Sequence, residues 1–352
     1  MRFCFEKVCV KKNRHEHQEW LDITNEINLN KPDDKEKKKR RSAIYHMPSA
    51  KRTAVHEDND DYVLVLTERI DVDAAKFLFA NLDLIPTVSE RSKFARYARP
   101  LIAGNGEHQV HYKPPPCGYG RPVPAEVCLQ GIDRRVRSPL ASNLYWDIDA
   151  SNSHPVVLHA IAYENGWDCD CLYYYIKNRE EVLSSIPLPR WLAKRVMLVK
   201  LYSGGVQSLL EKMIDDGEIT GTVNEYLRHI PPFVYEYGEE VSAMSSKVAR
   251  VYPELAKAAT DSAVKPDANI NARVLSILAQ TRETEVVMAA MEFMEFRGWQ
   301  VGVLVHDGFM VYKRSDALIN QALLNAIKMK VKEKCHLSID FEVKEFEKPY
   351  GI

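Results

Sequence analysis

Hydrophobic residues recur along the chain with two different periods. Strand-like runs occur at residues 62–67, 145–149, 301–312 and 337–346. The spacing of an amphipathic helix occurs at 71–82, 155–163, 192–202, 206–214, 317–334 and through most of 222–300, with a break at Lys265-Pro266. The Pro- and Gly-rich stretch 111–124 predicts a loop. This order predicts an α+β fold, in which helices back an antiparallel sheet and a helical subdomain is inserted between its halves.

The stretch 301–312, VGVLVHDGFMVY, predicts a β-hairpin with an acid at its tip. Two apolar runs flank His306-Asp307-Gly308, and Gly308 is expected to supply the unusual backbone angles of a tight turn. Asp307 has two interpretations at this point. Aspartate is a good turn residue, and a hairpin tip can also hold a metal ligand rigidly.

Composition bounds the class of protein. The 352 residues suit one large domain or two to three subdomains, and 45% hydrophobic residues are enough for a core. The net charge of −1 neither requires nor excludes a nucleic-acid partner, because a local basic cleft can bind phosphates. Seven cysteines without a CxxC pair predict reduced thiols and an intracellular location. The start lacks a signal-peptide pattern, and no apolar run is long enough to predict a membrane span.

A second candidate metal ligand is Asp149, which ends the predicted strand at 145–149. Two aspartates on neighbouring strand ends are the usual protein ligands of a two-magnesium site for phosphoryl transfer. The alternative is that Asp149 caps the following helix. Ser151, Asn152 or Ser153 can cap that helix instead.

A third pattern lies on the predicted helix around 190–202. Arg190, Lys194, Leu198 and Tyr202 are spaced by four residues, which places them along one slowly drifting helix face. Two cations followed by an apolar and an aromatic side chain suit a nucleoside triphosphate. A solvated helix surface gives the same spacing, so the pattern gains meaning from the two candidate metal acids on either side.

Four stretches, in this order, resemble the family A DNA polymerases and their single-subunit RNA polymerase relatives. DASNSHPVVLHAIA (149–162) resembles motif A, RWLAKRVMLVKLYSGG (190–205) resembles the O helix, and VHDGF (305–309) resembles motif C. YGRPVPAEVCLQGIDRR (119–135) is similar to the family's segment T-G-R-x7-L-Q-N-I-P-x-R, with the same gap between Arg121 and Leu129.

The resemblance implies a right-hand polymerase with an antiparallel-sheet palm, inserted helical fingers and a reduced thumb-like N-terminal region. The palm would comprise 141–185 and 265–352, the fingers 186–264, and the thumb-like region 61–140. Residues 1–60 would form a polar arm. Its basic run, Lys35–Arg41, suits nuclear localisation, phosphate binding or a solvated tail.

The resemblance also implies roles for single residues. Asp149 and Asp307 would hold two Mg²⁺ ions, or Mn²⁺, with the carbonyl of Ala150 as a further ligand. Lys194 would be catalytic at the departing pyrophosphate. Nucleotide binding falls to Arg190, Lys194, Leu198, Tyr202 and His154, and contact with primer–template DNA to Arg121, Gln130, Arg135, Gln280 and His306.

Three positions depart from the family's pattern. His154 and Gly308 stand where the family usually has glutamate, and Ser203 stands where it usually has glycine. His154 can exclude a ribose 2′-hydroxyl or hydrogen-bond to it, so the preference for deoxynucleotides stays open.

The resulting expectation is a DNA-directed DNA polymerase that uses dNTPs and a primer–template. It would lack proofreading, because the chain before residue 119 is too short for an exonuclease domain and a full thumb. Low processivity would make a replication partner useful. The alternatives are an RNA polymerase or primase-like enzyme, a non-catalytic nucleic-acid-binding relative and an HD-type phosphohydrolase. Compact size is typical of a virus, plasmid or mobile element.

Overall fold

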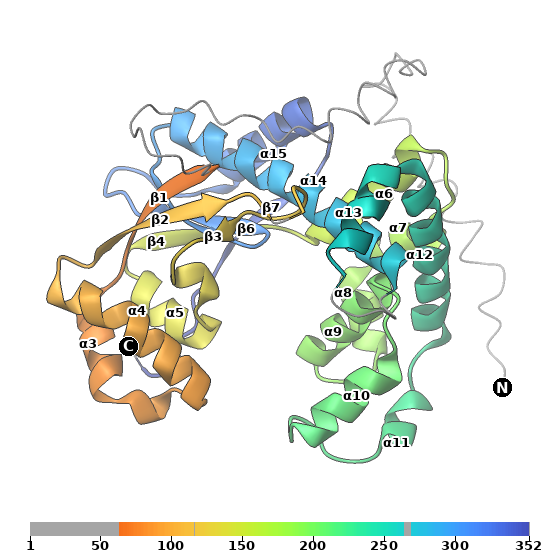
Figure 1. Ribbon diagram of the computed structural model, residues 1–352, viewed down its shortest axis with the longest axis horizontal. Helices are drawn as coiled ribbons and strands as arrows, with labels where there is room; N and C mark the ends of the chain where they lie inside the picture. The colour runs from red at the N-terminus through yellow and green to blue at the C-terminus, as the bar shows by residue number, and fades with distance from the viewer. Residues whose placement is uncertain (1–62, 116, 264–268, 352) are drawn as a thin grey trace. The chain divides into compact units, whose positions relative to one another are not determined.

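The computed structural model describes residues 63–115, 117–263 and 269–351 (Figure 1). The N-terminal arm 1–60, its basic run Lys35–Arg41 and the break at Lys265-Pro266 lie outside these residues. The described chain divides into two compact units. We call residues 63–157, 257–263 and 277–351 the sheet unit, and residues 158–256 and 269–276 the helical unit. In the sequence, the helical unit is inserted between the parts of the sheet unit.

The sheet unit contains the β-strands of the described residues. They are β1 (Leu64–Arg69), β2 (Glu107–Lys113), β3 (Val123–Pro124), β4 (Tyr145–Ala150), β5 (Val301–Val305), β6 (Gly308–Tyr312) and β7 (Phe341–Lys344). Its helical segments are α3 (Val72–Ala80), η1 (Leu82–Leu84), α4 (Val88–Ala103), η2 (Leu129–Gly131), α5 (Arg134–Ala141) and α15 (Gln321–Cys335). Boundaries between the units fall within α6 (Ser153–Glu164), α13 (Pro253–Asp261) and α14 (Ile270–Phe296).

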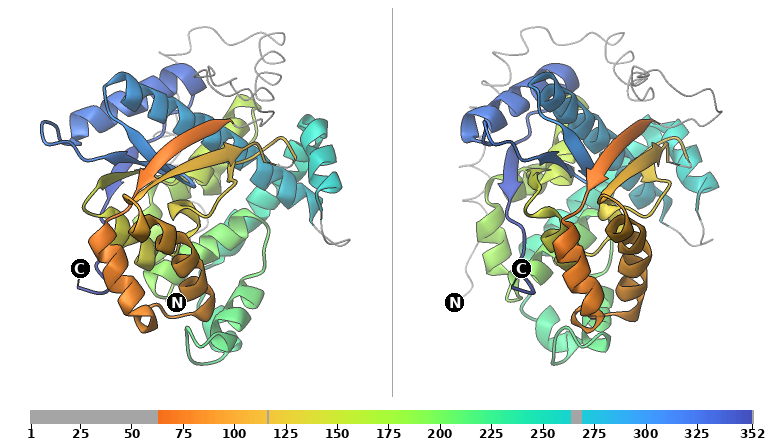
Figure 2. Two further views of the ribbon diagram at one scale, coloured as in Figure 1. Left: turned by 60° about the vertical axis from the view of Figure 1, so that its left-hand side comes forward. Right: turned by 90° about the vertical axis from the view of Figure 1, so that its left-hand side faces the viewer.

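Among the described residues, the strands pair into two antiparallel sheets, in the orders β1-β2-β3 and β5-β6-β4-β7. Figure 2 shows β1 and β2 side by side in both views. Consecutive β5 and β6 form the predicted hairpin, whereas β4 and β7 come from distant parts of the chain. The expectation of an antiparallel sheet in a mixed fold of strands and helices is confirmed.

Two tyrosines join the sheets. The Tyr145 hydroxyl accepts from the amide of Arg69 at 2.6 Å, and the Tyr312 hydroxyl donates to the carbonyl of Thr67 at 2.8 Å. Their rings lie 4.6 Å apart. A side chain at Gly302 would come within 2.8 Å of both rings, so this glycine leaves the space that the rings fill.

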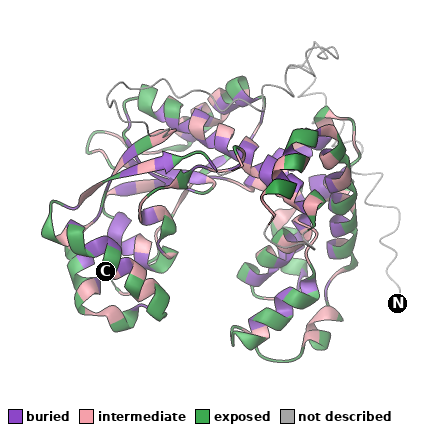
Figure 3. Cartoon of the chain, in the orientation of Figure 1, coloured by how far each residue is buried: buried purple, intermediate pink, exposed green. Residues whose placement is uncertain are grey.

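The core of the sheet unit follows from the alternation of side chains along its strands. Apolar residues of α3, α4 and α5 pack against Tyr145, Val303 and Met310, which face one side of the four-stranded sheet. Figure 3 shows buried residues concentrated along the strands and exposed residues on the outer helix faces. This packing fixes the ends of β4 and β6 in a rigid setting.

The helical unit contains α7 (Asp170–Lys177), α8 (Arg179–Ser185), α9 (Arg190–Leu201), α10 (Val206–Asp215), α11 (Val223–Leu227) and α12 (Pro232–Val251). The helix α9 packs against α8, α10 and α12. At the start of α7, the amides of Cys171 and Leu172 donate to the Glu240 carboxylate of α12, at 2.9 and 2.8 Å. Such bonds satisfy amides that a helix start leaves without an intrahelical partner.

Several elements lie where the periodicity predicted them, but the helices α4, α5, α7 and α8 were not predicted, and three further elements differ from the prediction. The strand β2 begins before the expected loop 111–124 and occupies its first residues, so this part of the loop prediction is wrong. The helix α15 begins at Gln321 rather than 317, because the Asn320 side chain caps it by accepting from the amide of Leu323 at 3.0 Å. The last strand spans only Phe341–Lys344 of the expected 337–346.

Candidate functional site

The two candidate metal acids of the sequence meet at one end of the sheet. In the β4–β6 ladder, Asp149 lies opposite Gly308, the residue after Asp307. One residue further, the amide of Ala150 donates to the carbonyl of Asp307 at 3.0 Å. The structure therefore brings together two aspartates that are far apart in the sequence.

The hairpin tip differs in detail from the expectation. In the turn, the residue with a positive φ is His306, at 49°, and the φ of Gly308 is not positive. Non-glycine residues adopt this conformation rarely, and such strain is concentrated at functional sites. The prediction that Gly308 supplies the unusual angle is wrong.

Gly308 is required for a different reason. A Cβ atom at this position would overlap the carbonyl oxygen of Ile148 and lie 3.0 Å from the Cα and Oδ1 atoms of Asp149. Any side chain here would push β6 away from β4. The glycine that stands where the resembled family usually has glutamate is thus tied to the close approach of β6 to β4.

Burial and like charge act together on Asp149, which is only 8% exposed. Burial and the neighbouring charge of Asp307 raise the pKa of Asp149 to about 7, while an ion pair with Lys344 opposes the rise. On the same sheet face, burial also raises the pKa of Asp147, against Arg137 and Lys344. Lys344 was not identified from the sequence, because its place opposite Asp147 depends on the register of β7.

This donor set fits hard divalent cations. Carboxylate and carbonyl oxygens are the ligands that Mg²⁺ and Mn²⁺ prefer, and a cation would relieve the repulsion between two acids. Within the described residues, no group of three or more His, Cys, Asp or Glu side chains is arranged to hold a metal. Metal binding at Asp149, Asp307 and the carbonyl of Ala150 therefore stays a prediction.

Two residues of β4, Tyr145 and Asp149, have different surroundings. Tyr145 is fully buried and belongs to the core. Asp149 pairs with Lys344, and no hydrogen bond from its carboxylate to an α6 amide is found among the described residues. Helix capping therefore does not account for Asp149.

Three of the residues predicted to contact DNA line one small pocket of the sheet unit. Arg121, Gln130 and His306 surround it, together with apolar residues of α14 and β5. The Gln130 Oε1 atom is buried and has no hydrogen-bond partner among the described residues. Desolvation and the charge of Arg121 lower the pKa of His306. The hairpin tip thus lies beside a small recess that Arg121 and Gln130 also line.

The other two predicted DNA contacts lie differently. Gln280 of α14 flanks the segment that carries Arg121, since its Oε1 atom lies 3.3 Å from the Cβ position of Gly120. Arg135 is exposed on α5, where its Nε atom lies 3.4 Å from Asp133. It does not line the recess.

His154 has a carboxylate partner that the sequence did not reveal. Its Nε2 atom lies 3.1 Å from Oε1 of Glu283 in α14, and Arg121 Nε donates to Oε2 of Glu283 at 2.5 Å. Glu283 is 1% exposed. Burial alone would raise its pKa, but His154 and Arg121 outweigh burial and lower the pKa to about 2. Glu283 stands in the helical segment TRETE, which in sequence has the composition of a solvated surface.

The predicted nucleotide-binding residues of the helical unit lie along α9, with Tyr202 at its C-cap. Leu192, Ala193, Val196 and Met197 are buried, whereas Arg190 and Leu198 are exposed and Lys194 is half-buried. Arg190 forms two hydrogen bonds with Glu180, of 2.9 and 2.5 Å, and both side chains are more than half exposed. The guanidinium of Arg190 is therefore bonded to a solvent-exposed carboxylate, which a ligand can replace.

The turn after α9 contains another departure from the resembled family's pattern, Ser203. Ser203 has φ 58°, a left-handed conformation that favours glycine. Gly204 follows, and a Cβ atom there would lie 2.6 Å from the Val199 side chain. The chain leaves the helix by a tight turn in which serine stands at the position suited to glycine.

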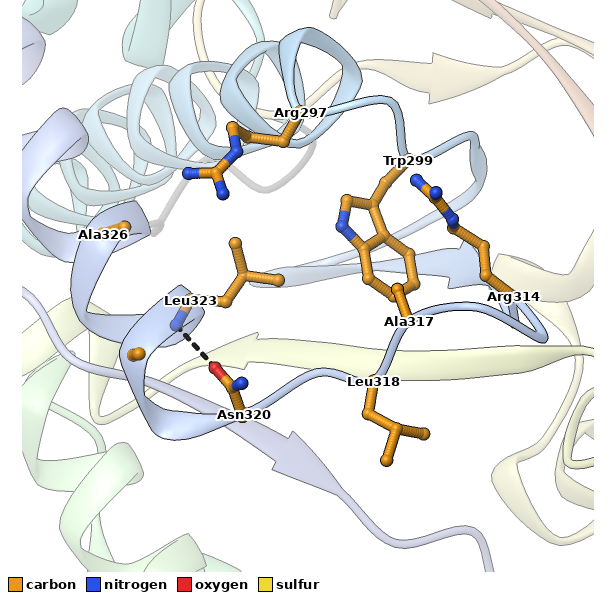
Figure 4. A pocket seen from close by; sticks show the side chains of 9 residues that line it. Arg297, Trp299, Arg314, Ala317, Leu318, Asn320, Leu323 and Ala326 are labelled. Carbon is orange, nitrogen blue, oxygen red and sulfur yellow. Dashed lines mark hydrogen bonds between the residues drawn. The ribbon is translucent and has the colours of Figure 1, made fainter.

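A separate pocket of about 460 Å³ lies at the other end of the β5–β6 hairpin (Figure 4). Trp299, Leu318 and Leu323 line it, and Arg314 lies over the Trp299 ring, 5.3 Å from its centre. A five-residue strand extends about 16 Å. The length of the hairpin thus separates this pocket from Asp307, and none of the predicted site residues lines it.

Two further observations concern expectations from composition. Among the described residues, no disulfide joins Cys117, Cys128, Cys169, Cys171 or Cys335, and their reduced state stays a prediction. Within the described part of the chain, no helix combines the length and the apolar character that crossing a bilayer requires.

Comparisons with known proteins give distant similarities. No protein-family profile matches the chain. The putative helicase V13 of Sputnik virophage is 25% identical over 224 residues, which are 62% of this chain and 27% of that protein. The chain thus spans about a quarter of the length of this relative.

A solved structure, the POL domain of Pol1 from M. smegmatis in complex with DNA primer-template and dNTP, is similar with a TM-score of 0.39. Sequence identity is 15%, over 78% of this chain and 55% of that chain. A TM-score at this level does not establish a shared fold, and neither similarity establishes membership of a family.

Proposed function

We propose that the chain is a template-directed nucleotidyltransferase, namely a DNA-directed DNA polymerase that extends a primer by two-metal phosphoryl transfer. The observation that carries the proposal is the convergence of Asp149 and Asp307 at the paired ends of β4 and β6. Burial and the charge of Asp307 raise the pKa of Asp149, and such a carboxylate pair can bind divalent cations. The four sequence motifs that resemble family A polymerases, in the same order, support this reaction over other metal-dependent chemistry.

In this proposal, Asp149 and Asp307 hold two magnesium or manganese ions, with the carbonyl of Ala150 as a further ligand. Bound ions would lower the pKa of the primer 3′-hydroxyl and neutralise charge on the triphosphate. Lys194 neutralises the departing pyrophosphate and can donate a proton to it from Nζ. Arg190 binds the phosphates after leaving Glu180, which costs little because the pair is exposed.

The remaining predicted residues orient the substrates. Leu198 and Tyr202 of α9 would pack against the nucleotide and the nascent base pair. Arg121, Gln130, Arg135, Gln280 and His306 would contact the primer–template. His154, fixed by Glu283, would read the sugar.

Two alternatives remain as proposals of lower rank. RNA synthesis on the same site is separated from DNA synthesis by the nucleotide that is used. A non-catalytic nucleic-acid-binding role would not account for two aspartates at the paired ends of β4 and β6. The name of the virophage relative does not transfer to this segment, because the chain contains no Gly-Lys pair and hence no G-x-x-x-x-G-K-[S/T] phosphate loop.

The test is extension of a labelled primer on a DNA template with magnesium, with dNTPs and NTPs supplied in separate reactions. Extension with dNTPs that Asp149→Asn and Asp307→Asn both abolish is the expected result. Extension with NTPs alone would assign the chain to RNA synthesis. DNA binding without extension by either substrate would favour the non-catalytic role.

A further inference from the structure

A buried ionic cluster in the sheet unit joins Arg121 and His154, two residues of the proposed site, to the carboxylate of Glu283. Glu283 lies inside α14 with its side chain 1% exposed, while Arg121 and His154, its two partners, reach it from a loop and from α6. A carboxylate only accepts hydrogen bonds, so the Nε2 atom of His154 must carry a proton to bond to Oε1 of Glu283. The Glu283 carboxylate is thus bonded by the guanidinium of Arg121 and the imidazole of His154.

The helix α14 also forms hydrogen bonds with the backbone of Gly120, the residue before Arg121. The amide of Gly120 donates to Thr281 Oγ1 at 2.9 Å, and Thr284 Oγ1 donates to the carbonyl of Gly120 at 3.1 Å. Thr281 and Thr284 are buried. Gly120 has φ 109°, a conformation that other residues rarely adopt. Backbone and side chain of this segment are therefore fixed by the same helix face.

This fixation leaves part of the guanidinium available to a ligand. Arg121 uses Nε for Glu283 and places Nη2 3.3 Å from His154 Nε2, while Nη1 has no partner among the described residues. Arg121 lines the recess beside the hairpin tip with Gln130, whose buried Oε1 atom also lacks a partner there. A donor and an acceptor thus lie in one recess with His306, the residue before Asp307.

We propose that Glu283 is a positioning residue for nucleic acid, which fixes the guanidinium of Arg121 so that its remaining N–H donors meet acceptor atoms of a primer–template duplex. The inference rests on the proposed function, because that function supplies the duplex. A guanidinium held at one edge loses little conformational freedom on binding. If Glu283 only neutralised the charge of Arg121 without fixing its side chain, it would weaken DNA binding instead of strengthening it.

The direction in which Glu283→Gln changes DNA affinity distinguishes a positioning role of Glu283 from an effect of its charge. Glu283→Gln keeps the shape of the side chain, removes one negative charge and releases Arg121. If charge alone matters, the extra positive charge strengthens DNA binding, since phosphates dominate affinity. If Glu283 positions Arg121, binding weakens although the protein has become more positive.

The experiment measures the dissociation constant of a fluorescently labelled primer–template duplex by anisotropy, without nucleotide, at one fixed salt concentration. We expect Glu283→Gln to weaken binding about tenfold, the size of one lost charge-assisted hydrogen bond. Glu285→Gln is the matched control, since it breaks the Arg282–Glu285 pair of the same helix, which lies at 2.5 Å with both side chains mostly buried. Equal or tighter binding by Glu283→Gln would overturn the inference.

Arg121→Lys provides a second variant that leaves no buried charge without a counter-ion. It keeps the net charge but removes the planar fork, so positioning predicts about threefold to tenfold weaker binding. Unchanged binding would contradict positioning, and circular dichroism spectra would show that each variant is folded. Failure of the unaltered chain to bind the duplex would overturn both the inference and the proposed function, whereas binding that is indifferent to both substitutions overturns the inference alone.

Discussion

Glu68 and Glu283 are carboxylates of the sheet unit with almost no exposure, at 0% and 1%, yet their pKa values shift in opposite directions. Burial raises the pKa of Glu68 to about 7, against hydrogen bonds from the Tyr97 hydroxyl and the Leu129 amide. The partners of Glu283, His154 and Arg121, lower its pKa to about 2 despite the same burial. The charge of a buried acid in this protein is therefore set by its partners.

Asp149 lies between these two cases. Burial first, and then the charge of Asp307, raise the pKa of Asp149 to about 7, and the ion pair with Lys344 compensates only in part. A divalent cation would give Asp149 the environment that Arg121 and His154 give Glu283. This view connects the carboxylate pair with the metal chemistry proposed for it.

The largest effect on stability is expected where a cation would lose its buried partner. Glu283→Gln should lower the free energy of unfolding by about 4 kcal/mol, because Arg121 is left without its counter-charge. Glu68→Gln should change it by about 1 kcal/mol at pH 7, since its partners are neutral donors. Urea unfolding of both variants checks the contrast, and equal losses would contradict it.

The two acids should also give opposite pH dependences. Between pH 4.5 and about 7, the unfolded chain releases the proton of Glu68 while the folded chain keeps it, so its contribution to stability falls with rising pH, by about 3 kcal/mol. Glu283 stabilises above pH 4.5, and this contribution is lost as the pH falls towards about 2. Unfolding as a function of pH, for the unaltered chain and Glu68→Gln, measures the first effect. A pH profile that Glu68→Gln leaves unchanged would contradict the assignment.

A smaller loss of stability is expected for a substitution at Gly308, which packs closely against Ile148 and Asp149 of β4. Gly308→Ala should cost about 2 kcal/mol of unfolding free energy, because its Cβ atom would overlap the Ile148 carbonyl. Gly131→Ala is the control, since a Cβ atom there meets nothing within 4 Å and its φ is not positive. Differential scanning calorimetry compares the two variants, and a Gly308→Ala variant as stable as the control would show that β4 and β6 can separate freely.

The smallest effect on stability is expected for the exposed pair in the helical unit. Arg190→Ala and Glu180→Ala should each change the unfolding free energy by less than about 0.5 kcal/mol. Their effects on nucleotide use should differ in sign. Arg190→Ala should raise the KM for dNTP about tenfold, and Glu180→Ala should lower it slightly by releasing Arg190. A KM that neither substitution changes would remove Arg190 from the proposed site.

Periodicity and motif spacing were enough to predict the hairpin, β4 and the helix α9. They also identified Asp149 and Asp307, which the structure places together. The strand β2 was missed in part because its outward-facing residues are polar and a Pro-rich loop follows it.

The remaining features depend on distant partners. Glu283 stands among charged and polar neighbours on a helix, and only the approach of Arg121 and His154 shows that it is buried and paired. Lys344 lies opposite Asp147 and forms its ion pair with Asp149 through strand register, which the sequence of β7 alone does not fix. Gly308 was assigned a turn role, whereas its lack of a side chain serves the close approach of β4.

The most direct test of the central claim is the single-turnover rate at which one dNTP is added to a primer in the presence of magnesium. Asp307→Asn should lower this rate at least about a thousandfold while the duplex still binds. Asp316→Asn should leave the rate unchanged, because Asp316 pairs with Arg314 near the other end of the hairpin. Extension by Asp307→Asn at the rate of the unaltered chain would contradict the assignment of the carboxylate pair.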